Sequence, residues 1–256
     1  MRSAIRLGLA VALLASVGLV PGAHAQDGQW MRVDIVQVLP DKLEEYIELQ
    51  IEQVNPALQR AGVPYRSSWR TAEFGNTYER LFVTPIANLA DFDTGGPLAR
   101  ALEPDRLDRI RDRVRRCTQS RQSYAIRYHP EMSVEVDNPS GLFLAQVATI
   151  QIAPGRQGEW EAFLRENLPQ FRESDVVFGV YERRFGPGPA SWQIVENHSS
   201  YAALDQLNIL ERAFGDQADE VAARLSGIVT SVERTVLRYD AELSFSAPAP
   251  TTQQQE

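Results

Sequence analysis

The sequence predicts an α+β fold in which two tandem repeats, each of the order β-α-β-β-α-β, pack their antiparallel sheets together as a one-chain α/β barrel. Two observations predict it: the two halves of the chain share similar segments, and the expected strands carry apolar side chains on both faces. Of the 256 residues, 43% are hydrophobic and 23% are charged, a composition typical of a globular protein with a core of its own.

Similar segments recur in the two halves of the chain. Three pairs match in the same order, at offsets of 114, 111 and 111 residues: Val36–Pro40 with Ile150–Pro154, Phe74-Gly75 with Phe185-Gly186, and Ala125–Ser133 with Val236–Ser244. Recurrence in the same order at nearly constant spacing indicates an internal duplication. We therefore expect a first repeat over residues 26–135 and a second over residues 136–245.

Hydrophobic spacing and turn residues predict the elements of each repeat. The first repeat is expected to contain strands at 30–39, 65–72, 77–84 and 124–128, a helix from Pro40 until Ala61-Gly62, and a helix at 104–117. The second is expected to contain strands at 143–152, 176–185, 191–196 and 234–239 and helices at 157–171 and 216–232. Cys117, the only cysteine, ends an apolar helical stripe, which indicates a buried small hydrophobe rather than a reactive thiol.

The first strand of the chain carries apolar side chains on both faces. Met31, Val33 and Ile35 point to one face, and Trp30, Val36 and Val38 point to the other. Helices on one side of a four-stranded sheet leave its second side open, and an apolar second side must be covered. The two sheets are therefore expected to cover each other with the helices outside, and any pocket is expected at the seam between them.

The first 25 residues have the three parts of a secretory signal peptide. Arg2 and Arg6 precede an apolar run from Leu7 to Val20, and Ala23-His24-Ala25 supplies small residues for cleavage. We expect cleavage after Ala25 and export to the periplasm or the medium. A run of roughly 14 apolar residues is short for a membrane span of about 20, so no stable membrane anchor is expected. Residues 246–256, rich in Pro, Thr and Gln, are predicted to form a disordered tail.

The charge of the chain argues against two kinds of partner. It has 26 basic and 34 acidic residues, and loss of Arg2 and Arg6 leaves a formal net charge of −10. No nucleic acid and no anionic membrane is expected as a partner, because either needs clustered positive charge. Six arginines and three aspartates lie between Asp105 and Arg116, and we expect a solvated, internally paired helix surface there rather than an anion site.

Short motifs at corresponding places in the two repeats resemble a known group. Each first strand leads through a proline to an aromatic residue, in Val38–Pro40 with Tyr46 and in Ile152–Gly155 with Trp160, and each third strand leads to Ser or Asn and Asp, in Val83–Asp91 and Val195–Asp205. With the element order, these motifs resemble the dimeric α/β-barrel, ferredoxin-like superfamily, in particular its antibiotic-biosynthesis-monooxygenase-like and NIPSNAP-like domains. The resemblance covers nearly all of Trp30 to Phe245 and implies a one-chain version of a barrel that is usually a dimer.

The resemblance implies several activities and does not choose among them. The superfamily contains cofactor-free oxygenases, haem enzymes, small-molecule degraders and proteins without known activity, and it has no invariant catalytic set to carry over. Three functions stay open: a small-molecule-binding barrel related to cofactor-free monooxygenases, a noncatalytic periplasmic interaction protein, and a haem-binding barrel. No cofactor other than haem is implied.

Polar side chains on the strands expected to be enclosed are the candidate ligand-binding residues. They are Arg32, Asp34, Arg70, Arg80, Gln146, Arg183, Arg184, Trp192 and Glu196, with His198 just beyond the strand of Glu196. A buried charge is costly unless it is paired or used, and small-molecule sites combine aromatic walls with a few polar groups. The set predicts a site for a small apolar or aromatic molecule. The alternative is that these residues face solvent at strand ends or form structural pairs, such as Asp34 with an arginine.

Two histidines remain once the signal peptide is removed. His198 is a candidate axial ligand for haem, with an exposed loop position as the alternative, and His129 is expected at an exposed turn. The two histidines and Cys117 lack the spacing of a zinc site, and the sequence has no nucleophile motif and no phosphate-binding glycine pattern. The sequence therefore assigns no catalytic residue and no metal.

Overall fold

The computed structural model describes residues 28–135, 143–174, 176–206 and 208–246. The predicted signal peptide, nearly all of the predicted tail, and residues 136–142 between the two halves lie outside the described residues. Within the described chain, no helix is both long enough and apolar enough to cross a membrane.

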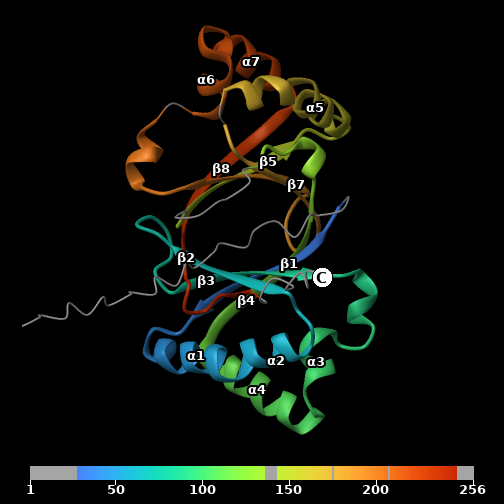
Figure 1. Ribbon diagram of the computed structural model, residues 1–256, viewed down its shortest axis with the longest axis vertical. Helices are drawn as coiled ribbons and strands as arrows, with labels where there is room; N and C mark the ends of the chain where they lie inside the picture. Colours follow the sequence, from blue (N-terminus) through green and yellow to red (C-terminus); the bar gives the residue numbers. More distant parts are fainter. Residues whose placement is uncertain (1–27, 136–142, 175, 207, 247–256) are drawn as a thin grey trace, which may run out of the picture.

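Eight antiparallel strands form a closed barrel (Figure 1). They are β1 (Trp30–Val38), β2 (Tyr65–Thr71), β3 (Glu79–Ile86), β4 (Thr118–Tyr128), β5 (Leu144–Ile152), β6 (Gly179–Phe185), β7 (Ser191–His198) and β8 (Val229–Tyr239). Around the barrel the order is β3-β1-β4-β6-β7-β5-β8-β2, and β2 pairs with β3 to close it. A short strand, β9 (Phe245–Ser246), pairs with the first two residues of β2.

The helices lie outside the barrel in two groups (Figure 1). The first half carries α1 (Leu43–Leu49), α2 (Asn55–Arg60), α3 (Gly96–Ala101) and α4 (Pro104–Cys117), and the second carries α5 (Gln157–Glu173), α6 (Ile209–Phe214) and α7 (Ala218–Leu225). Between α1 and α2, Gln50–Val54 form a π-helical turn, η2, so one helical segment runs from Leu43 to Arg60. Short 3-10 turns lie at Pro40–Lys42, Leu89–Phe92, Pro130–Met132, Tyr201–Asp205 and Gly215–Gln217. The predicted layering, with helices outside and an eight-stranded barrel inside, is confirmed.

The two halves of the barrel have the same strand-pairing scheme. The order is β2-β3-β1-β4 in the first half and β6-β7-β5-β8 in the second. The halves join at two seams, β4 with β6 and β8 with β2, where Tyr128 lies opposite Tyr181 and Trp69 lies opposite Tyr239. Each seam joins an edge strand of one half-sheet to an edge strand of the other, so closure covers edges that would otherwise be open to unwanted pairing.

Side chains from both halves pack in the space between the two half-sheets. Met31, Val33 and Ile126 are buried there, and the rings of Tyr128 and Tyr181 meet across the β4–β6 seam with centroids 5.1 Å apart. The expectation that the two half-sheets cover each other is therefore confirmed, although the apolar cluster between them belongs mainly to the first half. The cavity described below lies outside the barrel, between the sheet and the helices of the first half.

The last helix and last strand differ from the prediction. The helix predicted over 216–232 ends at Leu225, and β8 begins at Val229. Ile150 and Val232 are partners in the ladder between β5 and β8, and pairing along this ladder overrides the helical spacing of the apolar residues. Helices α3 and α6 were not indicated by hydrophobic spacing, because each is only six residues long.

The fourth strand of the first half is longer than its pattern indicates. β4 follows α4 directly at Thr118, so Arg121 and Ser123 are strand residues and not part of a connection. Polar residues dominate this first part of β4, which hides the strand from a search for apolar alternation. Cys117, at the end of α4, is fully buried as predicted.

His129 is buried where the halves join and does not occupy the exposed turn expected for it. It is 8% exposed, its Nδ1 lies 3.0 Å from Oε1 of Glu131 and its Nε2 lies 3.4 Å from Oε2 of Glu182, and its ring packs on Trp192. Burial alone would lower the pKa of the imidazole, but the carboxylates of Glu182 and Glu131 outweigh burial and raise it above its ordinary value. Strands distant in sequence create this environment, so the local turn pattern does not show it.

Gly186 occupies a tight position after β6, beside the β4–β6 seam. Its φ is +127°, and a Cβ atom added to it would lie 2.8 Å from Cα of Tyr124. We expect Gly186→Ala to lower the free energy of unfolding by about 2–3 kcal/mol, because backbone strain adds to the steric overlap. Urea denaturation of the two proteins measures this loss.

Gly155→Ala is the matched control for this prediction. Gly155 has a φ of +80°, but a Cβ atom added to it meets no atom within 4 Å. Gly155→Ala should lower the free energy of unfolding by only about 1 kcal/mol, because it adds backbone strain without steric overlap. Equal losses in the two variants would contradict the steric explanation.

Candidate ligand-binding site

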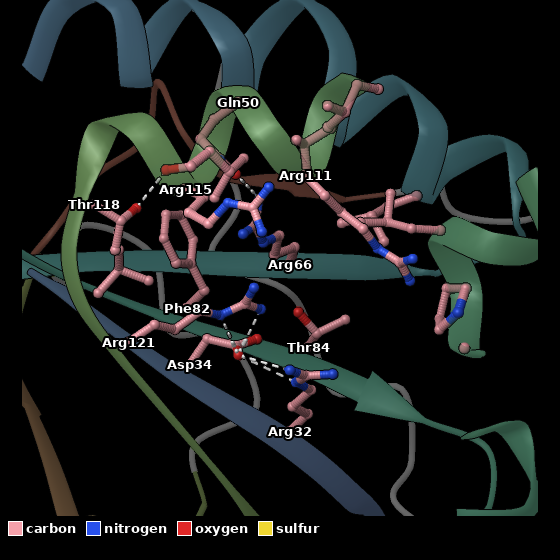
Figure 2. Close-up of a pocket in the computed structure, with 18 of the residues that line it drawn as sticks. Arg32, Asp34, Gln50, Arg66, Phe82, Thr84, Arg111, Arg115, Thr118 and Arg121 are labelled. Atoms are coloured by element: carbon pink, nitrogen blue, oxygen red, sulfur yellow. Dashed lines mark hydrogen bonds and ion pairs between the residues drawn. The ribbon is translucent and has the colours of Figure 1, made fainter. Parts of the chain in front are cut away.

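A cavity of about 590 Å³ lies between the first half-sheet and the helices that cover it. Strands β1, β3 and β4 form its floor, and α1, α4 and the loop before α3 stand over them (Figure 2). Sites for small organic molecules typically have volumes of about 300–1,000 Å³. All the described residues that line the cavity belong to the first half of the chain.

Asp34 of β1 holds two arginines at the floor of the cavity. Its Oδ1 accepts hydrogen bonds from Arg32 (Nε 3.2 Å, Nη2 3.0 Å) and from Arg121 (Nε 3.2 Å, Nη2 2.8 Å), and a fifth from the hydroxyl of Ser123. Figure 2 shows the two guanidinium groups reaching Asp34 from either side. Ser123 lies directly opposite Asp34 in the ladder between β1 and β4, so sheet register assembles this cluster.

The carboxylate of Asp34 stays ionised although it is only 7% exposed. Burial by itself would raise its pKa, but the positive charges of Arg121 and Arg32 and the hydrogen bond from Ser123 outweigh burial and lower the pKa below its ordinary value. A stabilised carboxylate that accepts five hydrogen bonds on one oxygen is a poor proton acceptor. Asp34 therefore serves to hold Arg32 and Arg121 in place.

Arg66 of β2 brings a buried positive charge to the cavity. Its Nη1 donates to Oε1 of Gln50 (2.9 Å) and to Oδ1 of Asn55 (2.8 Å), and its guanidinium lies over the ring of Phe82, 3.8 Å from the centroid. Its Nε is buried without a hydrogen-bond partner among the described residues. Burial lowers the pKa of Arg66 to about 10, so the group is still charged at neutral pH.

The π-helical turn brings together the two amides that bind Arg66. The backbone N–H of Asn55 donates to the carbonyl of Gln50, five residues earlier, which places both side chains on one side of the helix. Pro56 supplies the reason for the wide turn. It has no N–H for the carbonyl of Glu52, four residues earlier, and its ring would clash with that carbonyl in a regular α-helix.

The C-terminal segment of the second half supports these groups from behind. The carbonyl of Leu243, a fully buried residue, accepts a hydrogen bond from Nδ2 of Asn55 (3.0 Å). The hydroxyl of Ser244 accepts one from the backbone N–H of Ser68 (2.8 Å), and β9 pairs with β2 at Arg66. The position of Arg66 therefore depends on residues from both halves of the chain.

Two arginines of α4 complete the charged lining. Arg111 pairs with Asp108 (3.6 Å) and Arg115 pairs with Asp112 on the exposed helix surface, as the sequence predicted. Both arginines also line the cavity, which corrects the expectation that this helix only faces solvent. In all, the described lining contains five arginines and a single carboxylate, in a chain whose formal net charge is −8.

Among the predicted site residues, Arg32 and Asp34 line the cavity and the others do not. For Asp34 the alternative of a structural pair with an arginine also holds, because Arg32 is one of its partners. Arg80 is buried on the same sheet face but lies 4.0 Å from Asp240, with which it forms an ion pair. Arg70 is exposed at the end of β2.

Gln146, Glu196 and His198 lie on the helix-facing side of the second half, away from the cavity. Gln146 is opposite Glu196 in the ladder between β5 and β7, and Glu196 forms an ion pair with Arg212. His198 is half-buried at the end of β7, and burial lowers the pKa of its imidazole in spite of the nearby Glu196 carboxylate. This cluster is separate from the cavity-lining residues.

The remaining predicted residues have structural contacts. Trp192 is 3% exposed and belongs to the core of the second half. Arg183 lies over the ring of Tyr124, 4.3 Å from its centroid, and Arg184 pairs with Glu182 at 2.7 Å. The alternative that polar strand residues form structural contacts therefore holds for these positions.

Arg66, Arg121 and Ser123 are site residues that sequence patterns did not single out. Alternation along β2 could have indicated that Arg66 is enclosed. It places Arg66 on the same face as Ser68, which lies opposite the buried Phe82. For Arg121 and Ser123 no local signal exists, since their part of β4 lacks apolar alternation.

The second half has an apolar core where the first half has the cavity. Phe82 lies opposite Asp34 and Ser68, and in the second half Ile194 lies opposite Ala148 and Val180. By this register Ala148 stands where the first half has Asp34, and Phe178 stands where it has Arg66. Phe178 is 2% exposed and packs in one apolar cluster with Ile194.

The described residues do not fit a haem in this cavity. Its lining includes no histidine, cysteine or methionine, the usual protein ligands of haem iron together with tyrosine. The one lining tyrosine, Tyr46, is 2% exposed, and burial raises the pKa of its hydroxyl to about 12, which disfavours the phenolate. No group of three or more potential metal ligands occurs in the described part of the chain either.

Comparison with known proteins identifies the fold. No protein-family model and no curated protein matches the sequence. Solved structures do match, at low sequence identity. An anthrone oxidase-like protein has a TM-score of 0.58 and 12% identity, covering 84% of this chain and 92% of its own. A protein of Lactobacillus acidophilus named as a candidate monooxygenase has a TM-score of 0.54 and 13% identity, covering 86% and 97%.

A third match is a mutant chlorite dismutase from Candidatus Nitrospira defluvii. It has a TM-score of 0.51 and 12% identity, and the match covers 85% of this chain and 94% of that one. Together these structures show that the chain shares their fold, in agreement with the resemblance that the sequence motifs indicated.

The buried Asp34 cluster predicts a pH-dependent stability. Asp34→Asn should lower the free energy of unfolding by about 1–2 kcal/mol at pH 7, a value discounted because Arg32 and Arg121 are partly exposed. The pKa of Asp34 is lowered in the folded protein, so its contribution is present above about pH 4 and is lost as the pH falls through the lowered pKa. Denaturation curves of both proteins between pH 7 and pH 3 measure the difference.

Asp112→Asn is the control for this effect. Asp112 pairs with Arg115 on the exposed surface of α4, and exposed pairs contribute about 0–1 kcal/mol. A difference between wild type and Asp34→Asn that stays constant down to pH 3 would contradict the electrostatic role of Asp34.

Proposed function

We propose that this protein is an exported, small-molecule-binding α/β barrel related to cofactor-free monooxygenases, and that its ligand site is the cavity of the first half. One observation carries the proposal. The two halves share a strand-pairing scheme, yet the second has an apolar cluster at the positions where the first has a cavity with charged residues in its lining. The names of the anthrone oxidase-like protein and the candidate monooxygenase support a small organic ligand.

The chemistry of the lining favours binding as the primary role. General acid–base catalysis needs a group that exchanges protons near neutral pH. Asp34 is held ionised by its arginines, and the pKa of the Tyr46 hydroxyl is raised to about 12. We therefore assign no catalytic residue. If no compound binds, the alternative function, a noncatalytic interaction protein, is favoured.

The shared pairing scheme also supports our inference that the chain is a tandem duplication. The register that aligns Ala148 with Asp34 and Phe178 with Arg66 uses offsets of 114 and 112 residues, close to the offsets of 111 to 114 between the similar segments. After such a duplication one copy can keep the packed core while the other acquires a site.

The ligand site is tested by blocking the cavity. Thr84 of β3 is 8% exposed and lines the cavity, so Thr84→Trp should fill part of it. We expect compounds from an aromatic and polyketide-like panel to raise the melting temperature of the wild type, since ligand at 100 times its Kd adds about 2.7 kcal/mol of stability. The variant should lose that rise.

Thr230→Trp on β8 is the control, because Thr230 is exposed in the second half. It should retain the ligand-induced rise. If Thr84→Trp does not fold by circular dichroism, Ile110→Trp blocks the same cavity from α4. Equal ligand effects in wild type and blocked variants would place binding elsewhere and refute the proposed site.

Export is tested separately from binding. Expression of the full chain in a bacterium with a periplasm, followed by fractionation and N-terminal sequencing, should give a periplasmic protein that begins at Gln26. Substitution of Ala23 and Ala25 by bulky residues should leave an uncleaved precursor. A cytoplasmic protein that still begins at Met1 would refute export.

A further inference from the structure

Arg66 is a buried cation whose hydrogen bonds leave one edge of its guanidinium unused. Both amide oxygens, from Gln50 and Asn55, bind Nη1, and neither contacts Nε or Nη2. Nε and Nη2 form the side of a guanidinium that binds a carboxylate with two parallel hydrogen bonds. Nε is buried without a partner among the described residues, and Arg66 lines the cavity.

The fold does not require a charge at this position. In the second half the corresponding residue is Phe178, which is buried in an apolar core. A buried ion with only neutral partners is costly compared with an apolar residue of similar volume. Arg66 therefore costs stability that its half could recover with a side chain like that of Phe178, which indicates that the charge is kept for another purpose.

The surroundings of Arg66 do not neutralise its charge. The single carboxylate of the described lining, Asp34, already binds Arg32 and Arg121. Arg111 and Arg115 line the wall formed by α4 and pair with Asp108 and Asp112 on the helix surface. Figure 2 shows these arginines arranged around one space. Because Arg66 has only amide partners and low-dielectric surroundings strengthen its field, the cavity favours an anion over a neutral or cationic molecule.

The rest of the lining suits an apolar body. Apolar side chains from the helices and strands line the same cavity: Val54, Leu58, Ile86, Phe92, Leu98 and Ile110. A ligand that suits both the charged and the apolar lining of the cavity has a planar oxyanion at one end and an aromatic or aliphatic ring system at the other.

We propose that the cavity binds an organic acid as its carboxylate, with the carboxylate on the Nε and Nη2 edge of Arg66 and the apolar part between the sheet and the helices. This deepens the proposed function and rests on it, because it names the ligand class of the same site. The Gln50 and Asn55 amides, paired by the π-helical turn, orient Arg66 for this contact.

The test uses matched acids and amides of increasing size: benzoate and benzamide, naphthoate and naphthamide, and anthracenecarboxylate and anthracenecarboxamide. Calorimetric titration of the full mature protein at pH 7 should show that the best acid binds at least about tenfold more tightly than its amide. Arg66→Met should reduce binding of the acid at least about tenfold and leave the amide little changed. Arg66→Lys keeps the charge without the planar edge, so its affinity for the acid should lie between those of the wild type and Arg66→Met.

Arg80→Met is the matched control. Arg80 is also a buried arginine on the same sheet face, but it does not line the cavity. This variant should keep the wild-type preference for the acid. If Arg66→Met does not fold, the acid-to-amide ratio of the wild type and of Arg66→Lys still decides the question.

The outcomes separate this inference from the proposed function. Acids and amides that bind equally well would refute the inference while the proposed ligand site stands. A preference for the acid that Arg66→Met and Arg66→Lys both retain would refute the role of Arg66. No binding by any acid or amide, together with no stabilisation by the wider panel, would refute both.

Discussion

The structure depends on one constraint: the apolar inner face of the first half-sheet, and the open edges of both half-sheets, need the other half to cover them. The first half carries an apolar cluster toward the barrel axis, with Met31, Val33 and Ile126 at its centre, and the opposite half-sheet covers it. The seams of β4 with β6 and of β8 with β2 meet this need, and Tyr128 against Tyr181 and Trp69 against Tyr239 pack there. The cavity lies on the other side of the sheet, beneath the helices of the first half.

The two halves meet this constraint in the same way and differ in what they place under their helices. In the second half, Phe178, Ile194 and Ala148 belong to or pack against one continuous apolar cluster. In the first half, the corresponding Arg66, Phe82 and Asp34 border a cavity. The apolar core and the cavity thus lie in different halves, and Leu243 of the second half is fully buried against the first.

The arginines of the cavity are held in two different ways, by a carboxylate and by amides. Asp34 neutralises part of the charge of Arg32 and Arg121 and fixes their geometry through four hydrogen bonds. Arg66 is held by amides, which fix its position and leave its charge in place. A protein that is acidic overall therefore contains a locally cationic space, and the walls of low dielectric constant make that local field stronger than the net charge suggests.

The sequence by itself determined the order of the elements and the need for the two sheets to cover each other, because these follow from local periodicity and from apolar residues on both faces of a strand. It also marked Arg32 and Asp34 as polar residues on an enclosed strand. The tertiary structure alone decided that the cavity lies outside the barrel and that Arg121 and Ser123 bind Asp34. It also decided that Arg66 is held by two amides, with no carboxylate paired to it among the described residues. The physical reason is that register between distant strands, and the packing of helices over them, set which side chains share a space, and neither is encoded in the spacing of residues along one segment.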